Sequence, residues 1–426
     1  MKTSHAPAPR RRLIVVIAAG VVFLLLAGVG IYGLITGPRT APTPSPGEPG
    51  STATAPPDGG ASPVRIPAVP HSSDPEEFAR GFAEALFAWD TSSGFMPLDY
   101  TTVLLDAGDP TGTEQAGLAA DIALYLPTRD AWTGLREYGT TQHLTIDTAT
   151  VPDAWDDAVA QAQPGQLAPG TTAYTIDGTR HRDFTATPET ESPWGHGFQH
   201  GAPPSALVTH LLESVAPADG RLARVSVDLL GAVPLGLLHT TARIVRPGRR
   251  ICLVEAVVTD PEGRDVARGT GWWVHHVETS AVEKTVADPV TPRDECTVSD
   301  PEDPTSFLGM WASGYIDTLE VYSAPGQAWV RSPMSVVAGV PDSPWVRLMG
   351  VADTANGTNP TLNPREWQFM NTDITVCLHR LPRGEWTGIV ADANYGPDGV
   401  GLTVARLYDE EGPVGTCNQA LMINPL

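Results

Sequence analysis

Apolar and polar positions change their spacing along this 426-residue chain, and each change predicts a different kind of element. From Ser73 the pattern is helical: Asp74 suits a helix cap, Pro75 suits the first turn, and apolar residues recur at spacings of three and four as far as Trp89. A second helical stretch covers residues 114–126, and the strand-like segments QHLTIDTATV and TTAYTIDGTRHR follow. Helices followed by strands predict an α+β module over residues 73–182.

The remainder of the chain carries one pattern twice. Each copy has a polar turn, a helix of small residues at 200–213 or 343–357, and several β-rich strands. The segments 260–263 and 409–412 both place acidic residues before a glycine, as hairpin turns do. The repetition predicts two α+β units, each a sheet wrapped around one helix, at residues 183–284 and 307–426, with a linker over 285–306.

The first 72 residues lack both patterns. Residues 13–37 are uncharged and largely apolar, which is long enough to cross roughly 30 Å of hydrocarbon as a helix. Basic residues concentrate in the tail 1–12, so the positive-inside rule predicts a single-pass cell-membrane protein with a cytoplasmic N-terminus and an extracytoplasmic remainder. A cleaved signal peptide is the alternative, but Pro56 directly follows its candidate cleavage site, Ala53 to Ala55. The proline-rich stretch 38–72 predicts an extended tether.

Composition excludes some classes of function. A formal net charge of −22 and a sequence pI near 4.7 argue against nucleic-acid binding, which needs clusters of Lys and Arg. The four cysteines form no C-x-x-C pair, and His196, His200 and His210 are unevenly spaced, so we expect neither a metal nor another cofactor.

The segments DPEEFARGFAEALFAWDT and PGTTAYTIDGTRHR, together with the anchor and the tether, resemble one known family. They are similar to the extracytoplasmic part of actinobacterial conjugal-transfer membrane proteins, the TcpC-like family, which has a nuclear-transport-factor-like fold. The resemblance covers residues 1–182 and implies a role in assembly rather than in chemistry. The sequence changes character after Arg182, where further strands of that family would follow, and this predicts an incomplete module.

Six phrases in residues 183–426 carry a second resemblance: FTATPETESPW, QHGAPPSAL, VDLLGAVPLG, ARIVRPGRRICLVEA, LNPREWQFMNTDITVCLHR and GPVGTCNQALM. They resemble, in the same order, the thioesterase-like superfamily with tandem hotdog domains, of the acyl-CoA thioesterase II type. The resemblance implies a double hotdog fold, an acyl-CoA or other acyl thioester as substrate, and attack by water. It also implies a possible homo-oligomer.

The same resemblance implies a set of site residues. Asp353, in an otherwise apolar helix, matches the aspartate that orients the attacking water. Asn371 or Thr372 matches a threonine, and only one of them can face the pocket, because neighbours in a strand point in opposite directions. Gln419 matches the family's glutamine, although a strict count selects Asn418 instead.

The turn at His200, Gly201 and Ala202 is a candidate substrate-binding segment. Amides at the start of the following helix can stabilise an oxyanion, because helix starts carry unpaired N–H groups and a partial positive charge. Pro203 and Pro204 remove two of these donors, and a tight turn without a ligand is the alternative interpretation.

Two hypotheses of different classes follow. The leading one is a membrane-tethered hydrolase of the acyl-CoA thioesterase type that uses Asp353, Asn371 or Thr372, and Gln419. The alternative is a non-catalytic, membrane-anchored component of a conjugative transfer or type IV secretion apparatus. An extracytoplasmic location fits poorly with the first hypothesis, since acyl-CoA is a cytoplasmic metabolite. The sequence leaves acyl-chain length and oligomeric state open.

Overall fold

The computed structural model describes residues 65–426, except residues 109–110, 164–166, 169, 287 and 312–313. The predicted cytoplasmic tail, the predicted transmembrane helix at 13–37 and nearly all of the tether lie outside these residues. Among the helices that are described, none combines the length and the apolar character needed to cross a bilayer. The described residues all belong to one compact unit.

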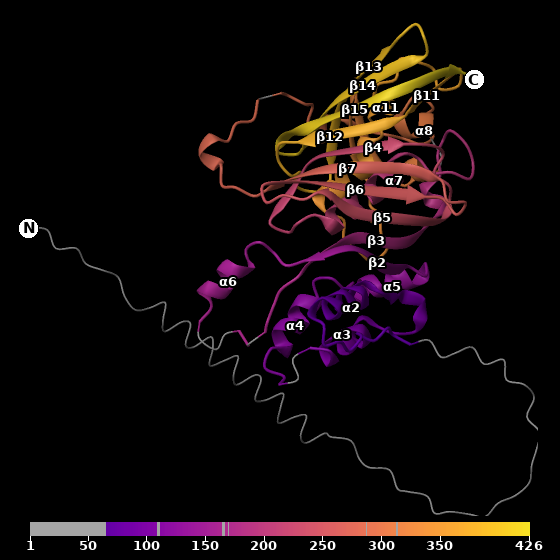
Figure 1. The fold of residues 1–426 in the computed structure, drawn as a ribbon. Coiled ribbons are helices and arrows are strands. Elements are labelled where there is room, and N and C mark those ends of the chain that lie inside the picture. The colour runs from indigo at the N-terminus through magenta and orange to yellow at the C-terminus, as the bar shows by residue number, and fades with distance from the viewer. Residues whose placement is uncertain (1–64, 109–110, 164–166, 169, 287, 312–313) are drawn as a thin grey trace, which may run out of the picture. The chain divides into compact units, whose positions relative to one another are not determined.

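The N-terminal part of this unit packs short helices against the first strands of a sheet (Figure 1). Its elements are α2 (Pro75–Phe87), β1 (Trp89–Asp90), α3 (Pro97–Asp106), α4 (Gln115–Ile122), α5 (Arg129–Glu137), β2 (Thr141–Thr150), α6 (Trp155–Gln161) and β3 (Thr175–Ala186). The predicted cap of the first helix is confirmed, because the Asp74 carboxylate accepts the N–H groups of Glu76 and Glu77 at 2.8 and 3.0 Å. Trp132 is fully buried, and its ring lies 5.5 Å from that of Trp89.

β3 joins this part to the rest of the sheet. One edge of β3 pairs with β2, and the other edge pairs with β5 (Gly236–Arg246) from Arg180 opposite Ala242 to Ala186 opposite Gly236. The boundary expected between residues 182 and 183 therefore lies within a strand. The ladder covers what would otherwise be an open edge of the next unit, where unpaired N–H and C=O groups invite aggregation.

The first repeat consists of α7 (Ala202–Val215) and the strands β4 (Gly220–Leu229), β5, β6 (Ile251–Thr259) and β7 (Asp265–His275). The sheet wraps α7, which is buried along most of its length and contacts all four strands. The predicted hairpin at 260–263 is confirmed between β6 and β7, where the Asp260 carboxylate accepts the N–H groups of Glu262 and Arg264. This carboxylate accepts N–H groups of the turn, as a backbone carbonyl does in a tighter turn.

The second repeat has more segments. It includes β8 (Thr297–Val298), α8 (Phe307–Trp311), α9 (Gly314–Asp317), β9 (Glu320–Ala324), β10 (Gln327–Arg331), α10 (Pro344–Ala352), α11 (Ala355–Thr358), β11 (Trp367–Asn371), β12 (Asp373–Leu378), β13 (Thr387–Tyr395), β14 (Val400–Asp409) and β15 (Gly412–Pro425). The hairpin predicted at 409–412 joins β14 to β15. The helix predicted as continuous over 343–357 is interrupted: α10 ends at Ala352, and Asp353 and Thr354 precede the short α11. The Thr354 hydroxyl donates to the Val351 carbonyl at 2.7 Å, a bond that competes with regular helix.

β4 and β12 join the two repeats into one antiparallel sheet, with Asp228 opposite Asp373. The strand order is β1-β2-β3-β5-β6-β7-β4-β12-β15-β14-β13-β10-β9-β8, and β11 pairs with β15 beside this path. α7 and α10 pack against each other on the inner side of the sheet. Their opposite ends meet, since Gly201 before α7 contacts Asp353 after α10, and Ser343 before α10 contacts Glu213 near the end of α7.

Candidate active site

Asp353 is the C-cap residue of α10 and is only 2% exposed. A buried carboxylate is costly unless it receives hydrogen bonds. Two side-chain amides supply them to the same oxygen: Asn371 Nδ2 lies 2.6 Å and Gln419 Nε2 lies 3.1 Å from Asp353 Oδ1. Gln419 Nε2 also donates to the Asp353 main-chain carbonyl at 3.2 Å. The carboxylate is therefore held in one orientation from two strands.

Strand geometry explains why these two amides converge. Asn371 ends β11 opposite Leu421 of β15, and Gln419 lies two positions before Leu421, so both point to the same face of the sheet. Thr372, the neighbour of Asn371, is exposed, and its hydroxyl donates to the Ala420 carbonyl at 3.4 Å. Of the alternatives that the sequence left open, the structure brings Asn371 and Gln419 to Asp353 and turns Thr372 and Asn418 to the other face.

The second carboxylate oxygen of Asp353 faces the start of α7. Asp353 Oδ2 lies 3.3 Å from His200 Nδ1, and a Cβ atom built on Gly201 would lie 2.6 Å from Oδ2. That distance is too short for a real contact, so the carboxylate occupies space that only glycine leaves free. The turn before the first-repeat helix and the end of the second-repeat helix thus share one site.

His200 is buried between Asp353 and an aromatic ring. Burial lowers the pKa of His200, and the nearby Asp353 charge opposes this shift without reversing it. The Nδ1 atom accepts the Ala202 N–H at 3.1 Å, which places the proton of the neutral imidazole on Nε2. The ring stacks on Tyr315 of α9 with centroids 5.5 Å apart. His200 therefore serves as a neutral acceptor in this structure.

The amides that begin α7 are mostly occupied or absent. The Ala202 N–H goes to His200, Pro203 and Pro204 have none, and the Ser205 N–H donates to the Gly201 carbonyl at 3.2 Å. The Gly201 N–H has no acceptor among the described residues, so of the N–H groups in this turn it is the one left unpaired. The predicted oxyanion segment is thereby reduced to one amide beside Asp353.

Aromatic side chains cover the site. The rings of Trp194, Trp311 and Phe369 lie 5.4 to 5.6 Å from one another, and Trp311 Nε1 donates to the Gly357 carbonyl at 3.2 Å. A small cavity of about 20 Å³ remains beside His200 and Trp311, which is room for about one water molecule. Nothing in the sequence marks Trp194, Trp311 or Tyr315 as site residues, because a lone aromatic residue in a loop or short helix usually belongs to a core.

The chemistry available here is that of a carboxylate and two amides. Gln419 is fully buried, and its Oε1 atom has no hydrogen-bond partner among the described residues, so it can accept a hydrogen bond from a bound water. In the same part of the chain, no group of three or more His, Cys, Asp or Glu side chains could hold a metal ion. All four cysteines are free thiols, and burial raises the pKa of Cys417 well above its usual value.

The fold and this cluster define a class: a two-repeat α+β protein with a buried, amide-held carboxylate where the repeats meet. Family models agree with this class. Residues 190–274 match the acyl-CoA thioesterase N-terminal domain, and residues 293–423 match the acyl-CoA thioesterase C-terminal domain. These two segments belong to the thioesterase-like superfamily, and the matches support a thioesterase-like function. Neither match reaches the N-terminal part, so its resemblance to conjugal-transfer proteins stays a prediction.

Solved structures with similar folds come from several bacteria. An acyl-CoA thioesterase II from Mycobacterium marinum is 13% identical, with a TM-score of 0.44 over 58% of this chain and 92% of that one. A conserved protein with a hot dog fold from Alicyclobacillus acidocaldarius is also 13% identical, with a TM-score of 0.45 over 57% of this chain and 93% of that one. A comparison with curated protein sequences found no match.

Proposed function

We propose that this protein hydrolyses acyl-CoA or another acyl thioester by direct attack of water. The observation that carries the proposal is the convergence of Asn371 and Gln419 on one oxygen of the buried Asp353 carboxylate. Charge-assisted hydrogen bonds of this kind fix the orientation of a carboxylate. The thioesterase family matches of residues 190–274 and 293–423 supply the substrate class.

Each group has a role in the proposed reaction. Asp353 Oδ2, which receives no hydrogen bond from the described residues, holds the water and takes its proton as general base. The Gln419 Oε1 atom accepts the second O–H of that water. The water oxygen bonds to the thioester carbon, and the Gly201 N–H donates to the developing oxyanion. The C–S bond then breaks, and the proton held by Asp353 passes to the leaving thiolate, giving an acid and a thiol.

Substrate entry requires a local rearrangement in this proposal. A thioester does not fit in a space of about 20 Å³, so the aromatic side chains that line this space must move when it binds. Catalytic hydrogen bonds are often completed only in the substrate complex. Mutation of Trp311 should therefore change KM more than kcat.

The test is release of free thiol from short, medium and long acyl-CoA by the full-length protein. A shorter protein that begins at Asp183 would lack the first part of β3, so the assay uses the protein with its N-terminal part. We expect turnover by the wild-type protein and a loss of about 100-fold or more in Asp353→Asn. Asp392→Asn, at an exposed position on β13, is the matched control and should retain activity. No turnover by a folded wild-type protein, or full turnover in Asp353→Asn, would overturn the proposal.

We also propose that residues 13–37 anchor the protein in the cell membrane, with the rest outside. The support is the uncharged apolar run and the basic residues that precede it. Protease added to intact spheroplasts should cleave the tether at 38–72. Cleavage would favour an extracytoplasmic thioester other than acyl-CoA, whereas complete protection would refute the orientation.

A further inference from the structure

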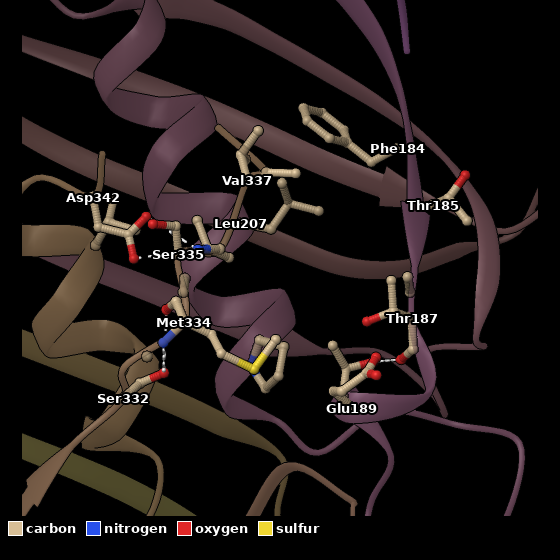
Figure 2. A pocket seen from close by; sticks show the side chains of 18 of the residues that line it. Phe184, Thr185, Thr187, Glu189, Leu207, Ser332, Met334, Ser335, Val337 and Asp342 are labelled. Carbon is tan, nitrogen blue, oxygen red and sulfur yellow. Dashed lines mark hydrogen bonds between the residues drawn. The ribbon is translucent and has the colours of Figure 1, made fainter. Parts of the chain in front are cut away.

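A second, larger cavity lies on the side of α7 and α10 that faces the N-terminal part of the protein. Its volume is about 410 Å³, within the range of roughly 300 to 1,000 Å³ that is typical of ligand sites. Figure 2 shows Phe184, Leu207, Met334 and Val337 around it. Most of its lining is apolar, which favours an apolar ligand body.

The cavity is built by segments that lie far apart in the sequence. Leu135 of α5, Tyr138 directly after α5 and Phe184 of β3 form one wall, and these residues lie outside the segments that match the thioesterase domains. The backbones of the walls are in close contact, because a Cβ atom on Gly134 of α5 would lie 2.8 Å from the main-chain carbon of Ala338. The wall that α5 forms is therefore packed tightly against the second repeat.

This cavity is separate from the Asp353 site. Its lining includes neither Asp353 nor Asn371 nor Gln419. Tyr315 stands between the two: it lines the cavity, its ring stacks on His200, and its hydroxyl donates to the Gly350 carbonyl at 2.6 Å. A molecule in the cavity is thus divided from the carboxylate by a hydrogen-bonded aromatic side chain.

Charged groups at the cavity determine which polar end a ligand can carry. Three acidic residues line it, Glu189, Asp342 and Glu385, and one basic residue, Arg347. The Glu385 carboxylate is already paired with Arg331, which leaves Asp342 and Glu189. Arg347 donates to the Asp342 main-chain carbonyl at 2.7 Å. The Asp342 carboxylate accepts only the Val336 N–H, at 3.1 and 3.2 Å, among the hydrogen bonds of the described residues, so it has lone pairs left for a donor. An anionic end would be repelled here.

We propose that this cavity binds an apolar molecule whose polar end is an uncharged or cationic hydrogen-bond donor. The Asp342 carboxyl is the acceptor for that donor, and residues 135–138 and 184–187 form a wall that the thioesterase domains alone would lack. The site is independent of thioester hydrolysis.

Three probes with the same chain and different polar ends test the proposal: 1-decanol, decylamine and decanoate. Calorimetric titration of the full-length protein should show binding of decanol and decylamine, with decanoate weaker by about tenfold or more. Leu207→Trp and the rim variant Met334→Trp fill the cavity and should each weaken decanol binding by about tenfold or more. Leu402→Trp, 44% exposed on β14, is the matched control and should bind decanol like the wild type.

Two more variants separate the parts of the proposal. Asp342→Asn should raise the affinity for decanoate towards that for decanol, and Asp353→Asn should leave all three affinities unchanged. The proposal is overturned if none of the probes binds, if both filling variants bind decanol normally, or if decanoate binds as tightly as decanol. A change of decanol affinity in Asp353→Asn would show that the two sites are one.

Discussion

The two junctions between α7 and α10 are similar in position and different in chemistry. At one, Asp353 follows α10 and faces Gly201 at the start of α7, with Asn371 and Gln419 donating to one of its oxygens. At the other, the Glu213 carboxylate near the end of α7 accepts a hydrogen bond of 2.6 Å from the hydroxyl of Ser343, the N-cap of α10. The repeat therefore provides two places for a carboxylate, and strand amides converge on only one of them.

The electrostatics of the junctions differ as well. Burial raises the pKa of Glu213, and the nearby Asp342 charge adds to the shift, while the Ser343 hydroxyl opposes it. Glu213, whose pKa is raised and which has one neutral donor, is suited to a structural role. A carboxylate fixed by two amides beside a buried acceptor suits proton transfer from water. The internal repeat thus doubles the scaffold without doubling the site.

Substitution of the two carboxyl groups should affect turnover very differently. Asp353→Asn should lower thioester turnover by about 100-fold or more, since the general base is lost. Glu213→Gln at the opposite junction should change turnover by less than about threefold. Steady-state assays of both variants check this, and equal losses would show that the two junctions act alike.

The next largest effect on turnover is expected from removal of the two amide donors, Asn371 and Gln419. A hydrogen bond to a charged group contributes about 1.5–3 kcal/mol, so Asn371→Ala and Gln419→Ala should each lower turnover by about 10- to 100-fold. Thr372→Ala and Asn418→Ala alter the adjacent positions on the opposite face and should leave turnover near the wild-type value. If Thr372→Ala were the damaging change, the assignment of faces would be refuted.

A smaller effect is expected from Gly201→Ala. The new Cβ would overlap Asp353 Oδ2, and overpacking of this kind costs about 1–3 kcal/mol. Both the unfolding free energy and turnover should fall. Gly231→Ala is the control, because a Cβ there meets nothing within 4 Å. An unchanged Gly201→Ala protein would mean that the carboxylate is not held against this turn.

Ser343→Ala should affect stability alone. It removes the cap bond to the Val346 N–H and the donor to Glu213, and loss of such a cap costs about 0.5–2 kcal/mol. Thermal unfolding should begin at a lower temperature, while kcat stays constant. A matching fall in kcat would show that the second junction takes part in hydrolysis.

The smallest effect concerns pH. Burial raises the pKa of Asp342 to about 6 from an ordinary 3.8, with the Val336 N–H and Arg347 opposing it. The folded state then holds a proton that the unfolded state releases, so stability falls as pH rises from about 4 to 6. Asp342→Asn should flatten this part of the stability curve in urea titrations. Some slope should remain in Asp342→Asn, because the raised pKa of neighbouring Glu213 acts in the same direction. A slope equal to that of the wild type would refute the shift.

Local features of the fold could be predicted from the sequence. The cap at Asp74, the hairpins at 260–263 and 409–412 and the repeated helix depend on residue types at short spacing, which local geometry constrains strongly, whereas Asp353 became a candidate through the family resemblance. The prediction of one continuous helix over 343–357 was wrong, because apolar periodicity does not show the Thr354 hydroxyl bonding to the Val351 carbonyl.

Features that depend on distant segments could not be predicted in this way. The choice of Asn371 over Thr372, and of Gln419 over Asn418, follows from the register of β11 on β15, since a shift of one residue would exchange the faces. The passage of β3 through the expected boundary, the Tyr315 partition and the large cavity likewise require chain segments to meet in space. Spacing along the chain constrains neighbours, whereas these features arise from packing between elements that are distant in the sequence.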